Sequence, residues 1–260
     1  MNVVIQTFVF AFGAIIGSFL NAVIWRLHVG QSFVRGRSKC IHCRHGLAAR
    51  DLVPVFSYLF LGGKCRYCRK PISPHYPIVE TVTGLLFVLA LMATVPAGET
   101  AAMTDLPRLL FHWFLVSVFV FAFVFDLKYL MILPEVIGPA TVAVLLAHLA
   151  LGDGWFSPVL GAVIAGGFFR IQFLVSRGRW IGGGDAWLGM FMGAALGWQK
   201  TLLALFLAYV GGATVATVML ITGRERLGQQ LAFGTFLSAA AVTVLLFGDA
   251  LLDWYWGLVF

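Results

Sequence analysis

Charged residues are scarce in this sequence. Only 11% of its 260 residues are Asp, Glu, Lys or Arg, whereas about 25% is usual in a soluble domain. Hydrophobic residues make up 60% of the chain, and the mean hydropathy is +0.93. This shortage excludes a soluble globular protein and predicts an all-α polytopic membrane protein, because helices satisfy their own backbone hydrogen bonds inside lipid.

Long apolar runs follow one another along most of the chain. A spanning helix needs about 20 mainly apolar residues, and eight candidate runs are 4–25, 76–96, 109–126, 131–151, 158–176, 184–198, 201–222 and 231–248. The aromatic segment 250–260 is typical of an interfacial tail. We therefore predict a first transmembrane helix at 1–25, a polar loop at 26–75, and a transmembrane core with its tail at 76–260.

Basic residues are absent from the start of the chain and concentrated in the polar loop. No Lys or Arg precedes Arg26, so the first run lacks the basic start of a signal peptide and is expected to insert with its N-terminus outside. The segment 26–75 holds ten of the 18 Lys and Arg residues, and on this topology only Arg108 and Lys200 lie outside. This asymmetry places the loop in the cytosol. Its basic face could bind anionic lipid or an acidic partner, and no motif indicates a nucleic-acid partner.

All four cysteines lie in that loop, as two C-x2-C pairs. Each pair puts two thiolates on one tight turn, and two such turns can close a tetrahedral zinc site. Four thiolates leave no open coordination position, so the zinc would be structural. Disulfides and redox pairs are weaker alternatives, because cytosolic thiols stay reduced. The predicted ligands are Cys40, Cys43, Cys65 and Cys68, and the alternatives that could replace one of them are His42 and His45.

Three acids lie in or beside apolar runs, where an ionisable group is a functional candidate by default. Asp126 ends the third run, Asp185 opens the sixth, and Glu80 lies near the start of the second. The predicted topology puts all three on the cytosolic side, with the two aspartates at one depth on separate helices. Considered alone, Asp185 could cap its helix, and Asp126 could form an ion pair with Lys128. Glu80 could orient a substrate group or act as a structural hydrogen-bond partner.

Two short motifs accompany the aspartates. Three glycines precede the second aspartate, and glycine permits unusual dihedrals and the close approach of a foreign backbone. A proline and a glutamate lie near the start of the fourth run, where the proline is expected to distort the first turns after about residue 131. The residues expected beside a bound substrate are Gly182, Gly183, Gly184, Pro134 and Glu135.

A pair of aspartates at one depth suits peptide-bond hydrolysis. Like charges held close together cannot both ionise, so the pair shares a proton. The ionised member can take a proton from water while the protonated member donates to the scissile carbonyl. No covalent intermediate is needed.

Several motifs together resemble one family. These are "GSFLNAVIWRL" at 17–27, the two C-x2-C pairs with "GKCRYCRKPIS", then "YPIVETVTG", "DLKYLMILPE" and "GGGDAWLGMFMGAALGW". In this order and spacing the chain resembles the bacterial type IV prepilin leader peptidases. The resemblance implies an eight-helix aspartic peptidase of the bacterial inner membrane that removes the basic leader of prepilins or type II secretion pseudopilins. Many members then methylate the new N-terminus with S-adenosylmethionine.

The same resemblance implies residue roles and exposes departures. It makes Asp126 and Asp185 the catalytic pair and the four cysteines zinc ligands. Where the family usually has Lys and Asp, this chain has Trp187 and Glu135; "NIP" becomes "LVP" at 52–54, and a "PFGPFLA"-like segment reads "LAFGTFLSAA" at 231–240. These departures bear on substrate details and methylation. A presenilin-like intramembrane protease and an ion transporter with relay acids are the alternative functions.

Overall fold

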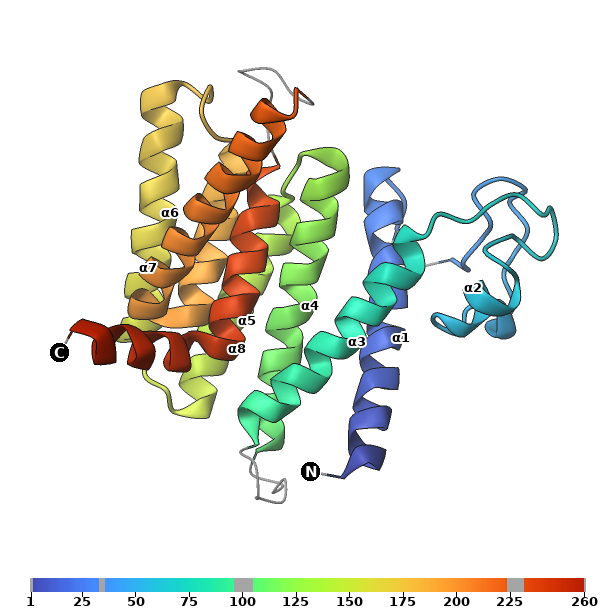
Figure 1. Cartoon of the computed structure of the whole chain (residues 1–260), viewed down its shortest axis with the longest axis horizontal. Helices are drawn as coiled ribbons and strands as arrows, with labels where there is room; N and C mark the ends of the chain where they lie inside the picture. Colours follow the sequence, from blue (N-terminus) through green and yellow to red (C-terminus); the bar gives the residue numbers. More distant parts are fainter. Residues whose placement is uncertain (1, 33–35, 96–104, 224–231, 260) are drawn as a thin grey trace. The chain divides into compact units, whose positions relative to one another are not determined.

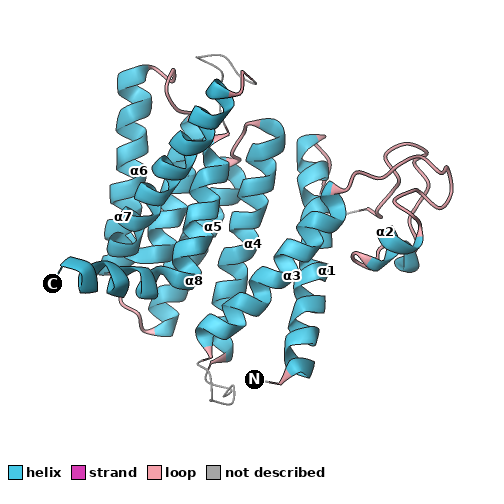
Figure 2. Cartoon of the chain, viewed as in Figure 1, coloured by secondary structure: helices cyan, strands magenta, loops and turns pink. Residues whose placement is uncertain are grey.

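The computed structural model describes residues 2–32, 36–95, 105–223 and 232–259 (Figure 1). Within these ranges the chain is helical, and Figure 2 shows no strand. This confirms the predicted all-α class. The elements are α1 (Val3–His28), a 3₁₀ turn η1 (Ala49–Asp51), α2 (Phe56–Phe60), α3 (His75–Thr94), α4 (Leu106–Tyr129), α5 (Pro134–Leu151), α6 (Phe156–Ser176), α7 (Gly183–Ile221) and α8 (Phe233–Val259).

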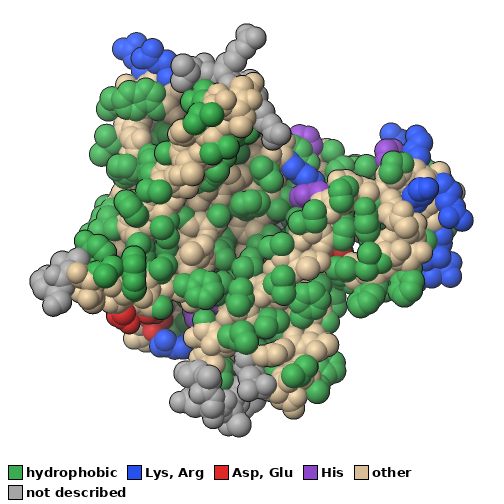
Figure 3. All heavy atoms as spheres, viewed as in Figure 1, with side chains coloured by type: hydrophobic (Ala, Val, Ile, Leu, Met, Phe, Trp, Pro, Cys, Tyr) green, Lys and Arg blue, Asp and Glu red, His purple; other side chains and the backbone are tan. Residues whose placement is uncertain are grey.

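Seven of the helices described are long and apolar enough to cross a membrane: all except the short α2. Large apolar side chains cover much of the visible face (Figure 3), as expected for a surface whose solvent is lipid rather than water. Most predicted spans match a helix with end shifts of a few residues. The segment predicted as an interfacial tail is helical and continues α8 to Val259. In Figure 1 this last part of α8 runs across the neighbouring helices of its unit, and its interfacial position stays a prediction.

The sixth and seventh predicted spans are the two limbs of α7, which turns back at Gly197. This residue has φ +73° and ψ 167°, a conformation outside the helix that glycine adopts without strain. Gly197 lies against Ser157 in the first turn of α6, whereas Gly189 and Tyr209, on either side of the break, both contact the 168–169 pair further along α6. The limbs are therefore antiparallel (Figure 1), and each of the eight predicted runs corresponds to a helix or to one limb of α7.

The fourth span begins later than predicted. α5 starts at Pro134, which occupies the first helical position. The N–H of a residue at the first helical position has no acceptor within the helix, so a proline there breaks no helical hydrogen bond. The prediction that Pro134 distorts the first turns of this span is therefore wrong.

The chain forms two compact units, residues 1–117 and 118–260. In the first unit α1 packs on α3 through small residues: a Cβ on Gly13 or Gly17 would lie 2.9 or 2.8 Å from backbone of α3. In the second unit α6 and the first limb of α7 touch where Gly161 faces Gly193. Small residues let helices approach closely inside membranes. Arg224 and Arg226, expected on the cytosolic side, lie outside the described residues.

Candidate active site and metal site

Asp126 lies in the last turn of α4 and is only 5% exposed. Its Oδ2 accepts a hydrogen bond of 2.9 Å from the backbone N–H of Thr235, and the N–H of Gly234 also donates to the carboxylate. Both donors belong to the first turn of α8, where backbone N–H groups have no acceptor within the helix. Asp126 therefore caps α8 from a different helix, at the positive end of its dipole.

Asp185 is the third residue of α7 and is 6% exposed. Its Oδ2 accepts a hydrogen bond of 2.9 Å from the N–H of Gly182. The N-cap of α7 is Gly182, so Asp185 is not the N-cap that its sequence position allowed; it is the third helical residue, and its carboxylate reaches back to the N-cap N–H. The carboxylate of each aspartate consequently lies at the N-terminus of a helix, that of Asp126 at α8 and that of Asp185 at α7.

Ile132 packs against residues that lie next to both aspartate carboxylates. A Cβ on Gly184, next to Asp185, would lie 2.8 Å from the Cβ of Ile132. A Cβ on Gly234 would lie 2.9 Å from the Cδ1 of Ile132 and 2.8 Å from Oδ2 of Asp126. The two carboxylates are close enough to interact electrostatically. The structure therefore brings Asp126 and Asp185 into one site, with Ile132 packed against the residue next to each.

The three glycines before Asp185 do not use unusual dihedrals. None of them has positive φ, and Gly182 is extended with φ −72° and ψ 150°. A side chain at position 184 would have no room, because Ile132 fills the space where it would lie. Gly183 lies beside Phe173. The expectation of special backbone conformation is wrong; contact with a substrate stays a prediction.

Pro134 and Glu135 lie at the start of α5, and Trp187 packs against the same helix; contact of Pro134 and Glu135 with a substrate stays a prediction. Pro134 and Glu135 form the first turn of α5, where an acid complements the helix dipole. Trp187 packs over Gly138 of α5, where a Cβ would lie 3.4 Å from the indole. Packing of an aromatic ring on a glycine gives a physical account of Trp187 where the family usually has lysine.

Glu80 joins the polar loop to the helices of the first unit. Its side chain is 8% exposed and accepts a hydrogen bond of 2.7 Å from the N–H of Val55 and another from the hydroxyl of Ser18 in α1. These contacts agree with the prediction that Glu80 acts as a structural hydrogen-bond partner. A role in orienting substrate stays a prediction.

The four cysteines converge on one point, as the spacing predicts. Their sulfur atoms all lie within 4.8 Å of one another, and Cys40 Sγ is 3.9 Å from Cys68 Sγ. A tetrahedral zinc ion with bonds of about 2.3 Å separates its ligand sulfurs by about 3.8 Å. None of the four forms a disulfide. The group fits a metal ion without His45, whose ring stacks on Tyr67 at a centroid distance of 3.7 Å.

The two halves of this site are copies of one turn. "KCIHCR" at 39–44 and "KCRYCR" at 64–69 fold alike: the first cysteine N–H donates to the carbonyl five residues later, and its carbonyl accepts from the N–H four residues later. Arg44 and Arg69 occupy the same left-handed position, with φ of 58° and 57°. This internal repeat is visible in the sequence as two K-C-x-x-C-R segments but was not among the predictions.

The thiols differ in acidity. Burial raises the pKa of Cys40, but hydrogen bonds from the backbone N–H groups of Cys43 and His42 outweigh it and lower the pKa to about 7. A backbone hydrogen bond at Lys70 lowers the pKa of Cys68, but desolvation and the neighbouring thiols raise it to about 11. A bound metal cation would remove this difference in protonation between the two thiols, because metal binding releases the thiol protons.

Asp51 fastens the second turn to the rest of the loop. Its almost fully buried carboxylate accepts from Nε of Arg66 at 2.6 Å, the hydroxyl of Tyr67 at 3.1 Å and the N–H of Ala48 at 3.1 Å. Burial raises the pKa of Asp51, but the hydrogen bonds from Arg66, Ala48 and Tyr67, together with the charge of Arg66, hold it below its usual 3.8.

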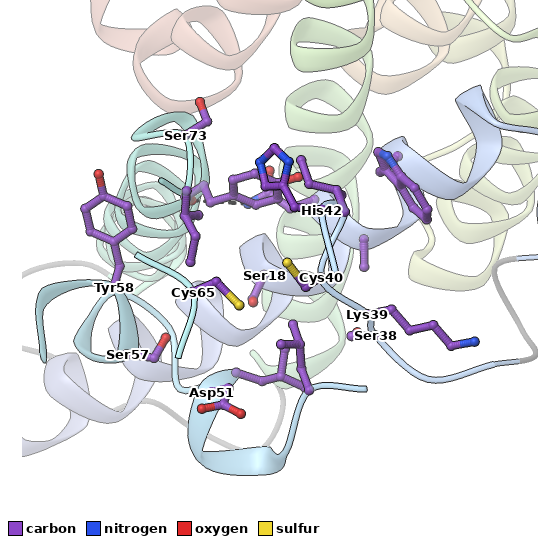
Figure 4. Close-up of a pocket in the computed structure, with 18 of the residues that line it drawn as sticks. Ser18, Ser38, Lys39, Cys40, His42, Asp51, Ser57, Tyr58, Cys65 and Ser73 are labelled. Carbon is purple, nitrogen blue, oxygen red and sulfur yellow. Dashed lines mark hydrogen bonds between the residues drawn. The ribbon is translucent and has the colours of Figure 1, made fainter. Parts of the chain in front are cut away.

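A cavity of about 710 Å³ lies between α1, α3 and the loop, within the first unit. Figure 4 shows Cys40 and Cys65 at its wall, with Ser57 and Tyr58 of α2 on another side. Trp25 and Glu80 also line it. A volume of this size is typical of small-molecule sites.

Comparison with known proteins agrees with this geometry. A family model described as the Bacterial Peptidase A24 N-terminal domain matches residues 11–94, and one described as the Type IV leader peptidase family matches residues 113–217. The first match contains the cysteine loop. The second contains both aspartates.

Relatives match almost the whole chain. A Prepilin leader peptidase/N-methyltransferase of Aeromonas hydrophila is 31% identical over 276 residues, covering 95% of this chain and 92% of the relative. Proteins of the same name from Bacillus subtilis (strain 168) and Myxococcus xanthus (strain DK1622) are 30% and 36% identical; the matches cover 95% and 84% of this chain and 96% and 64% of the relatives. No solved structure matches the chain.

Proposed function

Because the chain belongs to the type IV leader peptidase family, we propose that it cleaves the leader from prepilins or type II secretion pseudopilins with Asp126 and Asp185 as its catalytic pair. The observation that carries the proposal is the meeting of two buried carboxylates from separate helices in one site. Such a pair is the minimum apparatus for hydrolysing a peptide bond without a covalent intermediate.

The reaction divides between the two carboxylates. One carboxylate is ionised and removes a proton from the attacking water, while the other is protonated and donates to the carbonyl oxygen of the scissile bond. The proton belongs to the pair rather than to either residue. The backbone N–H groups of Gly234 and Gly182 fix the orientation of the carboxylates, so the water meets a geometry that is already in place.

We propose that the site opens on the cytosolic side of the bacterial inner membrane. The basic loop 26–75 supports this orientation through the positive-inside rule. The apolar helix of a prepilin then lies in the membrane and its basic leader lies in the cytosol. The cut falls where these two parts of the substrate join.

The proposal is tested by mass spectrometry of the N-terminus of a co-expressed prepilin. Asp126→Asn and Asp185→Asn keep the shape of the side chain, and each should abolish cleavage while the protein remains in the membrane. Asp249→Asn is the matched control, since Asp249 pairs with Lys200 instead and should leave processing unchanged. Normal processing by either variant of the pair would refute the mechanism. Cleavage of single-span substrates that lack a basic leader would favour the presenilin-like alternative.

We propose S-adenosylmethionine as the methyl donor for a second step, because the relatives are named N-methyltransferases. The cavity of the first unit is large enough for such a molecule. The residues that line the cavity include two aromatic side chains, Trp25 and Tyr58, and the basic Arg26, which are residue types suited to an adenine ring and a carboxylate. S-adenosylmethionine supplies an electrophilic methyl group. Binding to the whole protein that is weakened by Trp25→Ala would support this location, and unchanged binding would contradict it.

We propose zinc as the metal of the four-cysteine site. The complete thiolate set supports a soft, tetrahedral and structural ion, with no position left for a water molecule. In that position zinc would hold the two C-x2-C turns together. Elemental analysis of the purified protein identifies the metal.

A further inference from the structure

The short helix α2 exposes an unusually apolar face, formed by Val53, Phe56, Leu59 and Phe60. The side chains of Phe56, Leu59 and Phe60 are 60%, 64% and 86% exposed. Much of the surrounding loop is polar or basic, although Ile41 is also 55% exposed. Contiguous exposed apolar residues mark a surface that binds something apolar.

The opposite side of α2 is polar and faces the protein. Ser57 and Tyr58 line the cavity of the first unit (Figure 4). The helix therefore has two distinct faces within five residues. One face closes the cavity, and the apolar face of α2 points away from it.

Hydrogen bonds fix the depth of α2 beside the membrane helices. The N–H of Val55, immediately before α2, donates to Glu80 at 2.7 Å. Glu80 lies five residues into α3, about 8 Å along its axis from His75 at 1.5 Å per residue. Glu80 also accepts from Ser18, well inside α1. The helix α2 is thus held beside spanning segments, below the level at which they begin.

This depth matches that of an interfacial helix. Such helices bury their apolar face about 5–10 Å into the headgroup and acyl boundary. The apolar run 52–61 is too short to cross a bilayer, and segments of 10–14 residues are typically interfacial or re-entrant.

Charge around α2 favours a lipid surface over another protein. Lys and Arg side chains gather over the loop (Figure 3). An apolar face beside exposed cations complements a leaflet with anionic headgroups and apolar tails. The exposed basic residues that follow α2 are Lys64, Arg66, Arg69 and Lys70.

We propose that the apolar face of α2 is immersed in the leaflet on the loop side of the membrane and anchors the four-cysteine loop to the bilayer. The lipid then replaces water over three large side chains. The metal-bound turns are held against the membrane surface instead of projecting freely from it.

The test places a trifluoromethyl-phenylalanine label at Phe60 in the whole protein. Tyr58 is the matched control, because it is an aromatic residue of the same helix that faces the cavity. The protein is reconstituted in vesicles of phosphatidylethanolamine and phosphatidylglycerol, with a nitroxide either on the lipid acyl chain or on a water-soluble reagent. Fluorine relaxation then reports which reagent reaches each label.

We expect the acyl-chain nitroxide to relax the Phe60 label several-fold more than the Tyr58 label and more than the aqueous reagent does. Stronger relaxation of Phe60 by the aqueous reagent would overturn the proposal, because the face would then be hydrated. Protection from both reagents would also overturn it and would indicate a protein partner. A label at Phe56 repeats the measurement, and an unchanged metal content verifies that each labelled loop is folded.

Discussion

The carboxylate of Asp126 and the backbone N–H of Thr235 are joined by a hydrogen bond of 2.9 Å, although they lie 109 residues apart in the sequence. This bond makes the first turn of α8 part of the proposed active site. Thr235 occupies a position where the family's "PFGPFLA"-like pattern has proline, which carries no N–H. The chain therefore holds Asp126, one of the two proposed catalytic residues, with a donor that such a proline cannot supply.

Thr235→Pro removes this donor together with the bonds from the N–H and the hydroxyl of Thr235 to the carbonyl of Ala232, and proline itself fits the first turn of a helix. We expect kcat to fall about three- to tenfold with little change in KM, in line with the loss of one hydrogen bond. Thr235→Ala keeps the N–H and serves as the control, since it removes only the bond from the hydroxyl to the carbonyl of Ala232. Equal loss of activity in both variants would contradict a role for the N–H.

Gly234→Ala should damage the site more severely. The added Cβ would lie 2.8 Å from Oδ2 of Asp126 and 2.9 Å from Ile132, so the carboxylate or α8 must move. A misplacement of about 1 Å can cost on the order of 100-fold in rate. Gly211→Ala is the matched control, because its Cβ would meet open space. A prepilin cleavage assay in membranes measures the activity of both variants. Full activity of Gly234→Ala would show that the close contact between position 234 and Asp126 is unimportant.

Removal of one thiol should release the metal. Cys65 is the most buried of the four, and Cys65→Ser should lose the bound metal and increase hydrogen exchange across residues 39–71. His42→Ala should keep both properties, since the thiols converge without a histidine. Elemental analysis and exchange mass spectrometry measure these outcomes. Full metal occupancy in Cys65→Ser would exclude a site made of all four cysteines.

Asp51→Asn should loosen the loop in a pH-dependent manner. The native contacts hold the pKa of Asp51 below 3.8, so its ionised form stabilises the fold above that pH, and the contribution is lost as pH falls through the native pKa. At neutral pH we expect the free energy of exchange protection near residues 48–67 to fall by about 1.5–3 kcal/mol, the usual value for a hydrogen bond to a charged group. The difference in exchange protection between Asp51→Asn and the wild type should become smaller below pH 3.8. A constant difference across this range would contradict the assignment.

Much of the fold could be predicted because lipid imposes simple rules. Apolar runs of sufficient length predicted each spanning helix, and two C-x2-C pairs predicted the cluster of thiols. Asp126 and Asp185 were recognised as a pair because ionisable residues are rare at membrane depth. These signals are local and chemically unusual.

The contacts around the aspartates could not be predicted in the same way. Gly234 and Thr235 lie in the segment "LAFGTFLSAA", which the sequence marked only by its missing prolines. Their importance depends on backbone N–H groups, which every residue except proline carries, and on how α8 packs against α4. Ile132 gave no signal either, since a single isoleucine near a helix start is ordinary. The dihedrals of the glycines were predicted wrongly because glycine is also selected for small size.

The break at Gly197 makes the two limbs of α7 unequal. The first limb has only about 14 residues and a length of about 21 Å, less than the roughly 30 Å thickness of a hydrocarbon core. If Gly197 reaches the far surface, Asp185 lies below the near one. On the proposed mechanism, water and a substrate carbonyl then meet inside a depression in the bilayer, and the surrounding lipid must thin or tilt to match. Bilayer thickness is thereby expected to affect the rate of cleavage, alongside the chemistry of the two carboxylates.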